Sequence, residues 1–274
     1  MTHLSSTQQY LDYVHHTLTP ESKVSVLEKH YDTINREMQR SGTWKEHARL
    51  LDVGCGHGLY SEFWHSRGMH VTGIDFDASH IAYASERARA HNWSIRYETG
   101  SADRLPFADR SFDIVYANSL LEHVEDWECC LTDWIRVLAP GGLLWVETTN
   151  ILFPRQGEFR WLPFYSWWPG LLKGIAVRLA RGPLPALANY TPCPALHWFS
   201  FFQLEKFLSD RGLSVRDRFD CLDVDKVGRA KRLVRNLAVS NRLARRAAYL
   251  LLSPLVVLAT RPTASMSECS LVKS

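Results

Sequence analysis

The chain has 274 residues, of which 46% are hydrophobic and 22% charged, and its formal net charge at pH 7 is +3. This balance is typical of a folded globular protein and excludes a disordered or fibrous chain. A charge this small gives no reason to expect a nucleic-acid partner, because such proteins concentrate basic residues on one surface.

The start of the chain and its cysteines indicate the compartment. Residues 1–14 are polar and lack the apolar stretch of a signal peptide, so we expect a cytoplasmic protein. The six cysteines form no CxxC pair, which favours reduced thiols over a disulfide framework or a zinc site. They are Cys55, Cys129, Cys130, Cys193, Cys221 and Cys269. The longest apolar stretch, residues 247–259, is interrupted by Pro254 and is too short to span a bilayer.

The first half of the chain alternates between two kinds of segment. Residues 8–40 have helical apolar spacing on both sides of Pro20, which predicts helices ahead of the main fold. Short apolar runs then predict strands at residues 50–53, 70–74, 95–99, 112–117 and 143–148. Segments of helical length lie between them at residues 60–67, 79–91 and 127–138. This alternation predicts an α/β fold, a doubly wound, Rossmann-like and mostly parallel sheet.

The second half contains an aromatic insertion at residues 151–197. We expect its aromatic side chains either to line an apolar ligand pocket or to form core. A helix at residues 200–211, a strand at 213–219 and a final antiparallel strand at 255–260 follow. The predicted domain spans residues 49–262, with insertions at 151–197 and 225–252. An N-terminal helical segment (1–48) precedes it, and a tail (263–274) follows.

A glycine-rich loop follows the first predicted strand. It reads LDVGCGHG over residues 51–58, and ligands of open parallel sheets bind where such loops lie, at the carboxyl ends of the strands. Its GxGxG spacing differs from the GxGxxG that holds a dinucleotide pyrophosphate, which argues against a nicotinamide-dependent oxidoreductase. The loop suits a ligand without a pyrophosphate, such as the amino-acid end of S-adenosylmethionine.

An acid ends the second predicted strand. The Asp75 carboxylate can accept hydrogen bonds from both hydroxyls of a ribose, and Phe76 beside it can lie against an adenine. A helix-capping role is the other interpretation of Asp75. The glycine loop upstream favours the ribose.

Four motifs in this order resemble the class I S-adenosylmethionine-dependent methyltransferases, especially the ubiquinone-biosynthesis O-methyltransferases. They are LDVGCGHG, VTGIDFD, GSADRLPFADRSFDIVYANSLLEHV and LAPGGLLWVET, within residues 49–150, and HWFSFFQLEKFLSDRG continues the resemblance more loosely. The resemblance implies S-adenosyl-L-methionine as cofactor and a small-molecule acceptor. It places the cofactor beside Asp52, Gly54, Gly56 and Gly58 (methionine part), Asp75 (ribose), Ser101, Ala102 and Asp103 (adenine), and Asn118. The family often has Asp where this chain has Ser101.

Two histidines are candidate catalytic bases. His123 follows the fourth predicted strand, and the near-neutral pKa of a free histidine suits deprotonation of a hydroxyl. Its other interpretation is a turn former, with Glu122 facing solvent. In the ubiquinone-type relatives, the matching stretch resembles a divalent-metal site made of two acids and this histidine. Glu122 and His123 match that pattern, but Ser119 stands where the first acid would be, so we assign no metal ligand. His197 ends the aromatic insertion and is either a second base or an anchor of that insertion.

A basic segment lies near the end of the chain. Residues 226–246 contain no acid, and leucines and alanines interleave with their cations at near-helical spacing, which predicts one amphipathic basic helix. The cations are Lys226, Arg229, Lys231, Arg232, Arg235, Arg242, Arg245 and Arg246. Such a helix either gives peripheral membrane contact, through residues 226–252, or packs on the domain with a solvated face. The absence of a stacking-aromatic motif argues against RNA.

We therefore expect a methyltransferase acting on an oxygen of a hydrophobic or aromatic small molecule, such as a quinone precursor, a lipid or a secondary metabolite. The alternative is a protein that binds S-adenosylmethionine or its demethylated product without turnover, as a sensor or partner subunit. The sequence leaves the oligomeric state open, and nitrogen and carbon acceptors stay credible.

Overall fold

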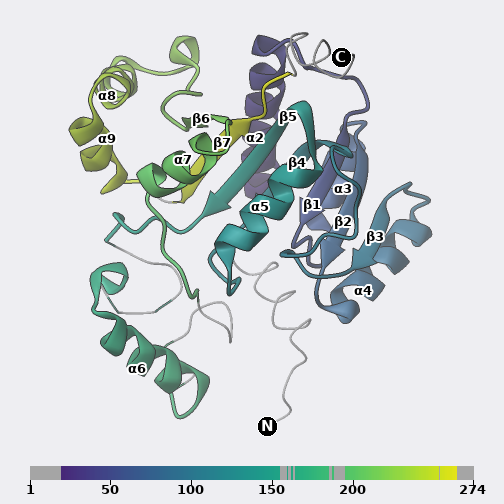
Figure 1. Ribbon diagram of the computed structural model, residues 1–274, viewed down its shortest axis with the longest axis horizontal. Helices are drawn as coiled ribbons and strands as arrows, with labels where there is room; N and C mark the ends of the chain where they lie inside the picture. Colours follow the sequence, from purple (N-terminus) through teal and green to yellow (C-terminus); the bar gives the residue numbers. More distant parts are fainter. Residues whose placement is uncertain are drawn as a thin grey trace, which may run out of the picture.

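One mixed sheet organises the protein. The computed structural model describes residues 20–154, 159, 162, 164–184, 187, 195–252 and 254–263. Seven strands lie in the order β3-β2-β1-β4-β5-β7-β6, and β7 runs antiparallel to both of its neighbours (Figure 1). The strands are β1 (Arg49–Val53), β2 (His70–Asp75), β3 (Arg96–Thr99), β4 (Phe112–Asn118), β5 (Leu138–Thr148), β6 (Ser214–Asp217) and β7 (Leu255–Thr260). This confirms the predicted doubly wound sheet with an antiparallel last strand.

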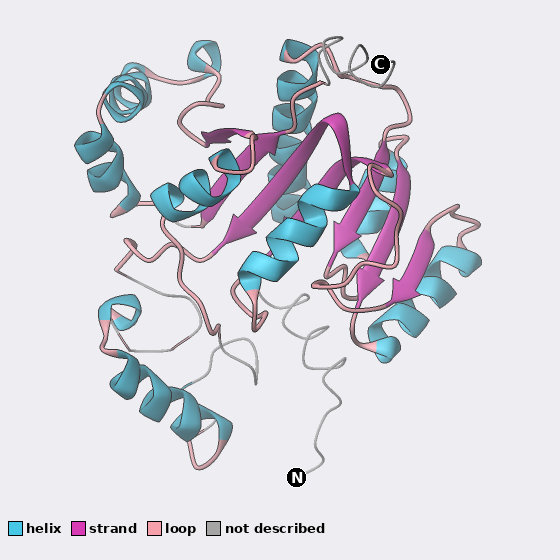
Figure 2. Cartoon of the chain, in the orientation of Figure 1, coloured by secondary structure: helices cyan, strands magenta, loops and turns pink. Residues whose placement is uncertain are grey.

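Helices cover both faces of the sheet (Figure 2). They are α2 (Pro20–Arg40), α3 (Leu59–Ser66), α4 (Ala78–Ala90), α5 (Trp127–Val137), α6 (Gly170–Arg181), α7 (Phe201–Ser209), α8 (Arg229–Ser240) and α9 (Arg242–Tyr249). The helix expected before Pro20 lies outside the described residues. Residues 100–111, all of them described, connect β3 to β4 without a helix, so that connection stays close to the sheet edge.

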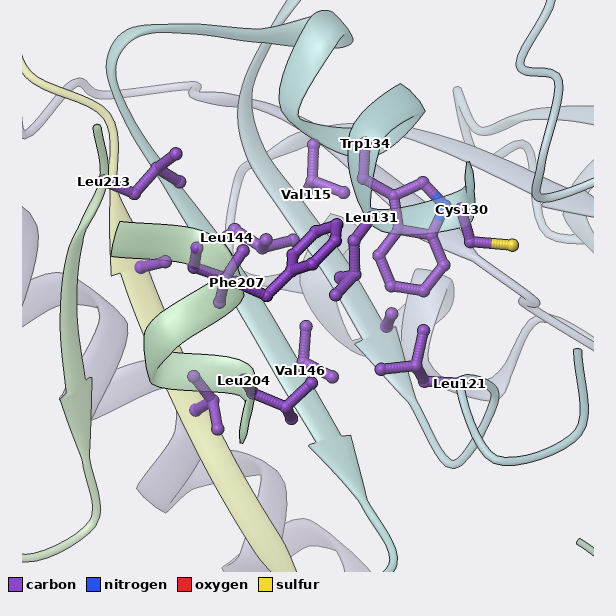
Figure 3. Packing of buried hydrophobic residues seen from close by; sticks show 14 of the residues in the cluster. Val115, Leu121, Cys130, Leu131, Trp134, Leu144, Val146, Leu204, Phe207 and Leu213 are labelled. Carbon is purple, nitrogen blue, oxygen red and sulfur yellow. The ribbon is translucent and has the colours of Figure 1, made fainter. Parts of the chain in front are cut away.

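The core has two layers because successive side chains of a strand point to opposite faces. On one face, Ile34 of α2 and Trp64 of α3 pack with Tyr116 of β4. On the other, α5 and α7 pack against β4 and β5, with Trp134 and Phe207 among the buried side chains (Figure 3). The strands are therefore fixed from both sides, and so are the loops at their ends.

Side-chain caps begin α4 and α5 at the carboxyl edge of the sheet. The Asp77 carboxylate accepts the backbone N–H of Ser79 at the start of α4, and Asp126 accepts that of Cys129 at the start of α5. Each cap satisfies an N–H group that has no partner inside the helix. The caps fix where the chain leaves β2 and where it enters α5.

The aromatic insertion builds a small core of its own. Phe159 and Tyr165 are buried with Ala176 and Ala180 of α6. Phe164 and Trp167 are about half exposed, and Trp161 lies outside the described residues. For Phe159 and Tyr165 the structure favours the core interpretation over the ligand pocket.

The basic segment differs from its prediction. It forms two helices, α8 and α9, because the chain leaves helical geometry at Asn241, where φ is −142° and ψ is 122°. The Asn241 side chain then accepts the N–H groups of Leu243 and Ala244 and begins α9. Asparagine competes with helix geometry in this way because its side chain hydrogen-bonds the backbone.

The described cysteines are reduced, and the described helices lack the combination of length and hydropathy needed to span a membrane. Cys55, Cys129, Cys130 and Cys221 are free thiols, and Cys193 and Cys269 lie outside the described residues. Among the described residues, no helix is both long and apolar enough to cross a bilayer.

Candidate functional site

A pocket of about 520 Å³ opens at the carboxyl edge of β1, β2 and β4. Its walls come from the loops that follow these strands and β3, together with the first turn of α5. The lining residues are Val53, Gly54, Ile74, Asp75, Phe76, Gly100, Ser101, Ala102, Asp103, Leu120, His123, Val124, Glu125, Asp126 and Cys130. Seven residues predicted from the sequence lie on its wall: Gly54, Asp75, Phe76, Ser101, Ala102, Asp103 and His123.

The glycine loop forms one end of the pocket. Gly54 has a φ of +70°, and a Cβ there would lie 2.8 Å from the Leu120 side chain. A side chain at this position would therefore strain the backbone and would require the Leu120 side chain to move. Its N–H donates to the Ile74 carbonyl at 2.8 Å, which ties the loop to the end of β2.

Asp75 lies in the middle of the pocket with its carboxylate held in place. Oδ2 accepts the N–H of Gly56 at 2.9 Å, and Oδ1 accepts that of Asp77 at 2.9 Å. A carboxylate offers about four lone-pair directions, so acceptor capacity is left for a ligand hydroxyl. Phe76 lies next to it with 79% of its surface exposed, which leaves an aromatic face for a planar ligand.

The segment 101–103 forms the other end and is held from α5. The Trp134 indole N–H donates to the Ala102 carbonyl at 2.9 Å, and the Ser101 hydroxyl donates to the Asp103 carboxylate. A negative charge therefore stands on this loop although position 101 is neutral. Ser101 keeps its oxygen lone pairs as acceptors for a ligand amino group.

The remaining predicted cofactor residues, Asp52, Gly56, Gly58 and Asn118, are not among the residues that line the pocket. Asp52 is 1% exposed and accepts the Ser61 hydroxyl at 2.6 Å. Burial raises its pKa to about 7, against the effect of the Ser61 hydrogen bond. Gly56 and Gly58 lead from the loop into α3. Asp52 thus supports the loop from inside the fold.

Asn118 ends β4 on the same face of the sheet as Asp52. Its side-chain N–H donates to the Tyr60 hydroxyl at 3.0 Å. Its Oδ1 is buried and has no hydrogen-bond partner among the described residues. A buried amide oxygen is costly without a donor, so this atom suits a ligand N–H at the glycine-loop end.

The two histidines have different positions. His123 lies on the pocket wall, and its backbone N–H donates to the Leu120 carbonyl at 2.9 Å, so it also ends a turn. His197 is not among the lining residues, and its Nε2 donates to the Glu125 carbonyl at 3.2 Å. Its backbone N–H donates to the Glu122 carbonyl, which joins the end of the insertion to the loop after β4.

Glu122 differs from the solvent-facing interpretation. Its side chain is 4% exposed and accepts the Thr148 hydroxyl at 2.7 Å, so it points into the fold. Among the residues that the structure describes, no three His, Cys, Asp or Glu side chains gather as a metal-binding group.

Sequence reasoning missed the wall made by the loop after β4 and the start of α5. Leu120, Val124, Glu125, Asp126 and Cys130 all line it. Because these residues come just after the strand predicted at residues 112–117, at the edge where ligands bind, the sequence could have indicated that they line the pocket. Burial raises the pKa of the Cys130 thiol to about 12, so it faces the pocket as a neutral, weakly polar group.

The residues present fit an adenosine joined to an amino acid. An exposed aromatic ring and the 101–103 loop suit the adenine, a fixed carboxylate suits the ribose, and the orphaned Asn118 oxygen suits an ammonium. The GxGxG loop lacks the GxGxxG spacing of a loop that binds a pyrophosphate.

Residues 51–146 match the model of the methyltransferase domain family. This stretch is a class I S-adenosylmethionine-dependent methyltransferase domain. The cofactor of this family is S-adenosyl-L-methionine.

The methyltransferase domain has curated relatives at modest identity. The ubiquinone biosynthesis O-methyltransferase of Rhizobium leguminosarum bv. trifolii is 34% identical over 156 residues, covering 54% of this chain and 62% of that protein. The malonyl-[acyl-carrier protein] O-methyltransferase of Erwinia billingiae is 31% identical over 127 residues, covering 46% of this chain and 49% of that protein. The aligned part thus spans less than two thirds of these relatives.

Solved structures show the same fold at low identity. The YcgJ protein of Bacillus subtilis has a TM-score of 0.52 at 16% identity, covering 85% of this chain and 100% of that one. The geranyl diphosphate C-methyltransferase of Streptomyces coelicolor has a TM-score of 0.53 at 17% identity, covering 89% of this chain and 81% of that one. These similarities concern the fold alone.

Proposed function

We propose that this protein transfers the methyl group of S-adenosylmethionine to an oxygen of a hydrophobic or aromatic small molecule. The observation that carries the proposal is the pocket itself, where Gly54, Asp75 and the 101–103 loop converge. The names of the O-methyltransferase relatives support oxygen as the methylated atom. We further propose residues 49–262 as the catalytic domain.

Each predicted cofactor residue has a role in this proposal. Asp75 accepts the ribose hydroxyls, Phe76 lies against the adenine, and Ser101, Ala102 and Asp103 border its edge. At the other end Gly54 lets the backbone approach the methionine part, and Asn118 accepts from its ammonium. Asp52, Gly56 and Gly58 hold the loop that makes this approach.

The cofactor, when bound, supplies an activated methyl group on a sulfonium. The protein's task is then to orient the acceptor, exclude water and take up a proton. His123 is the group on the pocket wall that can remove a hydroxyl proton as the O–C bond forms and the S–C bond breaks. His197 fits better as the anchor of the aromatic insertion, because its ring N–H is engaged by a carbonyl.

The test combines cofactor binding with product detection. Purified protein, stripped of cofactor, is titrated with S-adenosylmethionine by calorimetry and then incubated with phenols, catechols and hydroxylated lipids. We expect binding, and mass spectrometry should detect one acceptor class gaining a single methyl group. His123→Gln should leave cofactor binding intact and lower the rate by about 100-fold or more. His197→Gln is the matched control.

Two results would overturn the proposal. Cofactor binding without product on any acceptor class would assign the protein to non-catalytic binding. No heat with S-adenosylmethionine, together with binding of a nicotinamide cofactor, would exclude methyl transfer altogether.

A further inference from the structure

The helix pair α8 and α9 exposes apolar side chains in an ordered pattern. On α8, Leu233, Val234 and Leu237 are 61%, 47% and 52% exposed, and their spacing puts them on one helix face. Leu243, at the start of α9, is 71% exposed, and Leu251, two residues beyond the end of that helix, is 80% exposed. An amphipathic helix that packs only on its own domain turns such a face inward.

The leucines are exposed although α8 and α9 are firmly held on the domain. Arg245 of α9 is buried, pairs with Asp220 at 2.9 Å, and donates to the Ala238 carbonyl of α8 at 3.0 Å. The Tyr249 hydroxyl donates to Asp217 at 2.7 Å. A polar network therefore fastens the pair beside β6, with the leucines turned outward. Figure 1 shows α8 and α9 together at the rim of the molecule, next to β6 and β7.

Cations accompany these leucines. Residues 226–246 contain no acid. Within the described chain, Arg229, Lys231, Arg232 and Arg246 make no ion pair with a carboxylate, although Arg232 donates to the Val224 carbonyl and Arg246 lies over the Phe202 ring. Arg242 pairs with Glu205. An exposed apolar face flanked by unpaired cations is the pattern of a helix that lies in the interface of a charged lipid layer.

We propose that α8 and α9 bind the surface of an anionic lipid bilayer, with the leucines inserted and the cations at the headgroups. The positive charge of this surface favours an anionic bilayer over a second copy of the chain or a terminal segment of the same chain. A second copy of the chain would place the same cations opposite one another across a two-fold axis. The terminal segments outside the described residues carry one acid each, Asp12 and Glu268, so neither offers matching charge.

The test is vesicle sedimentation of the full chain. Vesicles of phosphatidylcholine alone are compared with vesicles containing phosphatidylglycerol, at low and high salt. We expect uptake by the anionic vesicles only, decreasing as salt rises. The assay needs neither cofactor nor acceptor, so its result is separate from that for methyl transfer.

Paired variants separate charge from apolar insertion. The double variant R229Q/K231Q should lower the partition coefficient by about 30-fold, about fivefold for each cation. The double variant L233S/L237S should lower it by about tenfold or more per leucine. The matched controls are R89Q/R96Q, with Arg89 on α4 and Arg96 on β3, and L171S on α6, which should bind as the unaltered protein does. All of these side chains are exposed, so the melting temperatures should stay unchanged.

Three results would overturn the inference. Equal uptake by neutral and anionic vesicles, or equal losses in the controls, would remove the role of this surface. A concentration-dependent dimer in analytical ultracentrifugation that L233S/L237S abolishes would assign the face to a second copy of the chain.

Discussion

The backbone N–H of Gly56 donates to Oδ2 of Asp75 at 2.9 Å. This hydrogen bond joins the glycine loop after β1 to the acid that ends β2. Both halves of the proposed cofactor site are therefore positioned before a ligand arrives, and less ordering is needed on binding. The same contact makes Asp75 both a proposed ribose ligand and a support of the loop.

Replacing Asp75 tests both roles. Asp75→Ala should raise the dissociation constant of S-adenosylmethionine by about 10-fold to 100-fold, because hydrogen bonds to a charged group contribute about 1.5–3 kcal/mol. Calorimetry measures this change. Glu86→Ala, at an exposed site on α4, is the matched control and should bind as the unaltered protein does. Unchanged affinity in Asp75→Ala would remove this carboxylate from the site.

Gly58 is required by conformation and space. It begins α3 with a φ of +82°, and a Cβ there would overlap the Tyr97 hydroxyl and lie 3.1 Å from the Ala84 Cβ. We expect Gly58→Ala to lower the free energy of unfolding by about 2 kcal/mol, measured by urea denaturation. Gly174→Ala in α6 meets nothing within 4 Å and should instead raise it by up to about 1 kcal/mol. Equal effects of the two changes would contradict this account.

Trp134 should position the adenine loop through its indole N–H. Trp134→Phe removes the hydrogen bond to Ala102. Trp145→Phe removes a similar volume, but the Trp145 indole N–H has no partner among the described residues. We therefore expect Trp134→Phe to cost about 1 kcal/mol more stability. The dissociation constant of S-adenosylmethionine should rise about fivefold in Trp134→Phe alone. A matching rise in Trp145→Phe would indicate a general packing effect.

Glu147 should make stability depend on pH. It is partly buried on β5, with Oε2 3.3 Å from Nε2 of His30, and removal from water raises its pKa to about 7. Protonated Glu147 can donate to Nε2, while Nδ1–H of His30 donates to the Tyr116 hydroxyl at 3.0 Å. Because the folded state then holds a proton that the unfolded state releases, stability should fall as pH rises from about 4.5 to 7.

The variant Glu147→Gln isolates this contribution. Urea denaturation from pH 5 to 8 should show a flatter curve, with a relative gain approaching about 3 kcal/mol above pH 7. Burial lowers the pKa of His30 to about 4, which gives the opposite slope, but His30 is present in both proteins. Glu86→Gln serves as the exposed control. Parallel curves for Glu147→Gln and the unaltered protein would show that the carboxyl is ionised in the fold.

The sequence by itself determined the sheet and the edge of it at which the pocket lies. Apolar periodicity and glycine positions are local signals, and they predicted all seven strands and placed Gly54 and Asp75 at strand ends. The antiparallel direction of β7 was predicted because mixed sheets with such a last strand are common, and the structure confirms it. The positions of the strands and of these strand-end residues depend on nearby residues in the sequence, so a single sequence is enough to predict them.

Only the tertiary structure decided which side chains meet. Glu122 turns inward to Thr148, His197 lies against the Glu125 carbonyl, and Leu120 closes the glycine end of the pocket. The break at Asn241 depends on a side-chain cap that competes with helical geometry. Such contacts join residues far apart in the chain or balance two local preferences, and hydrophobic periodicity carries no information about either.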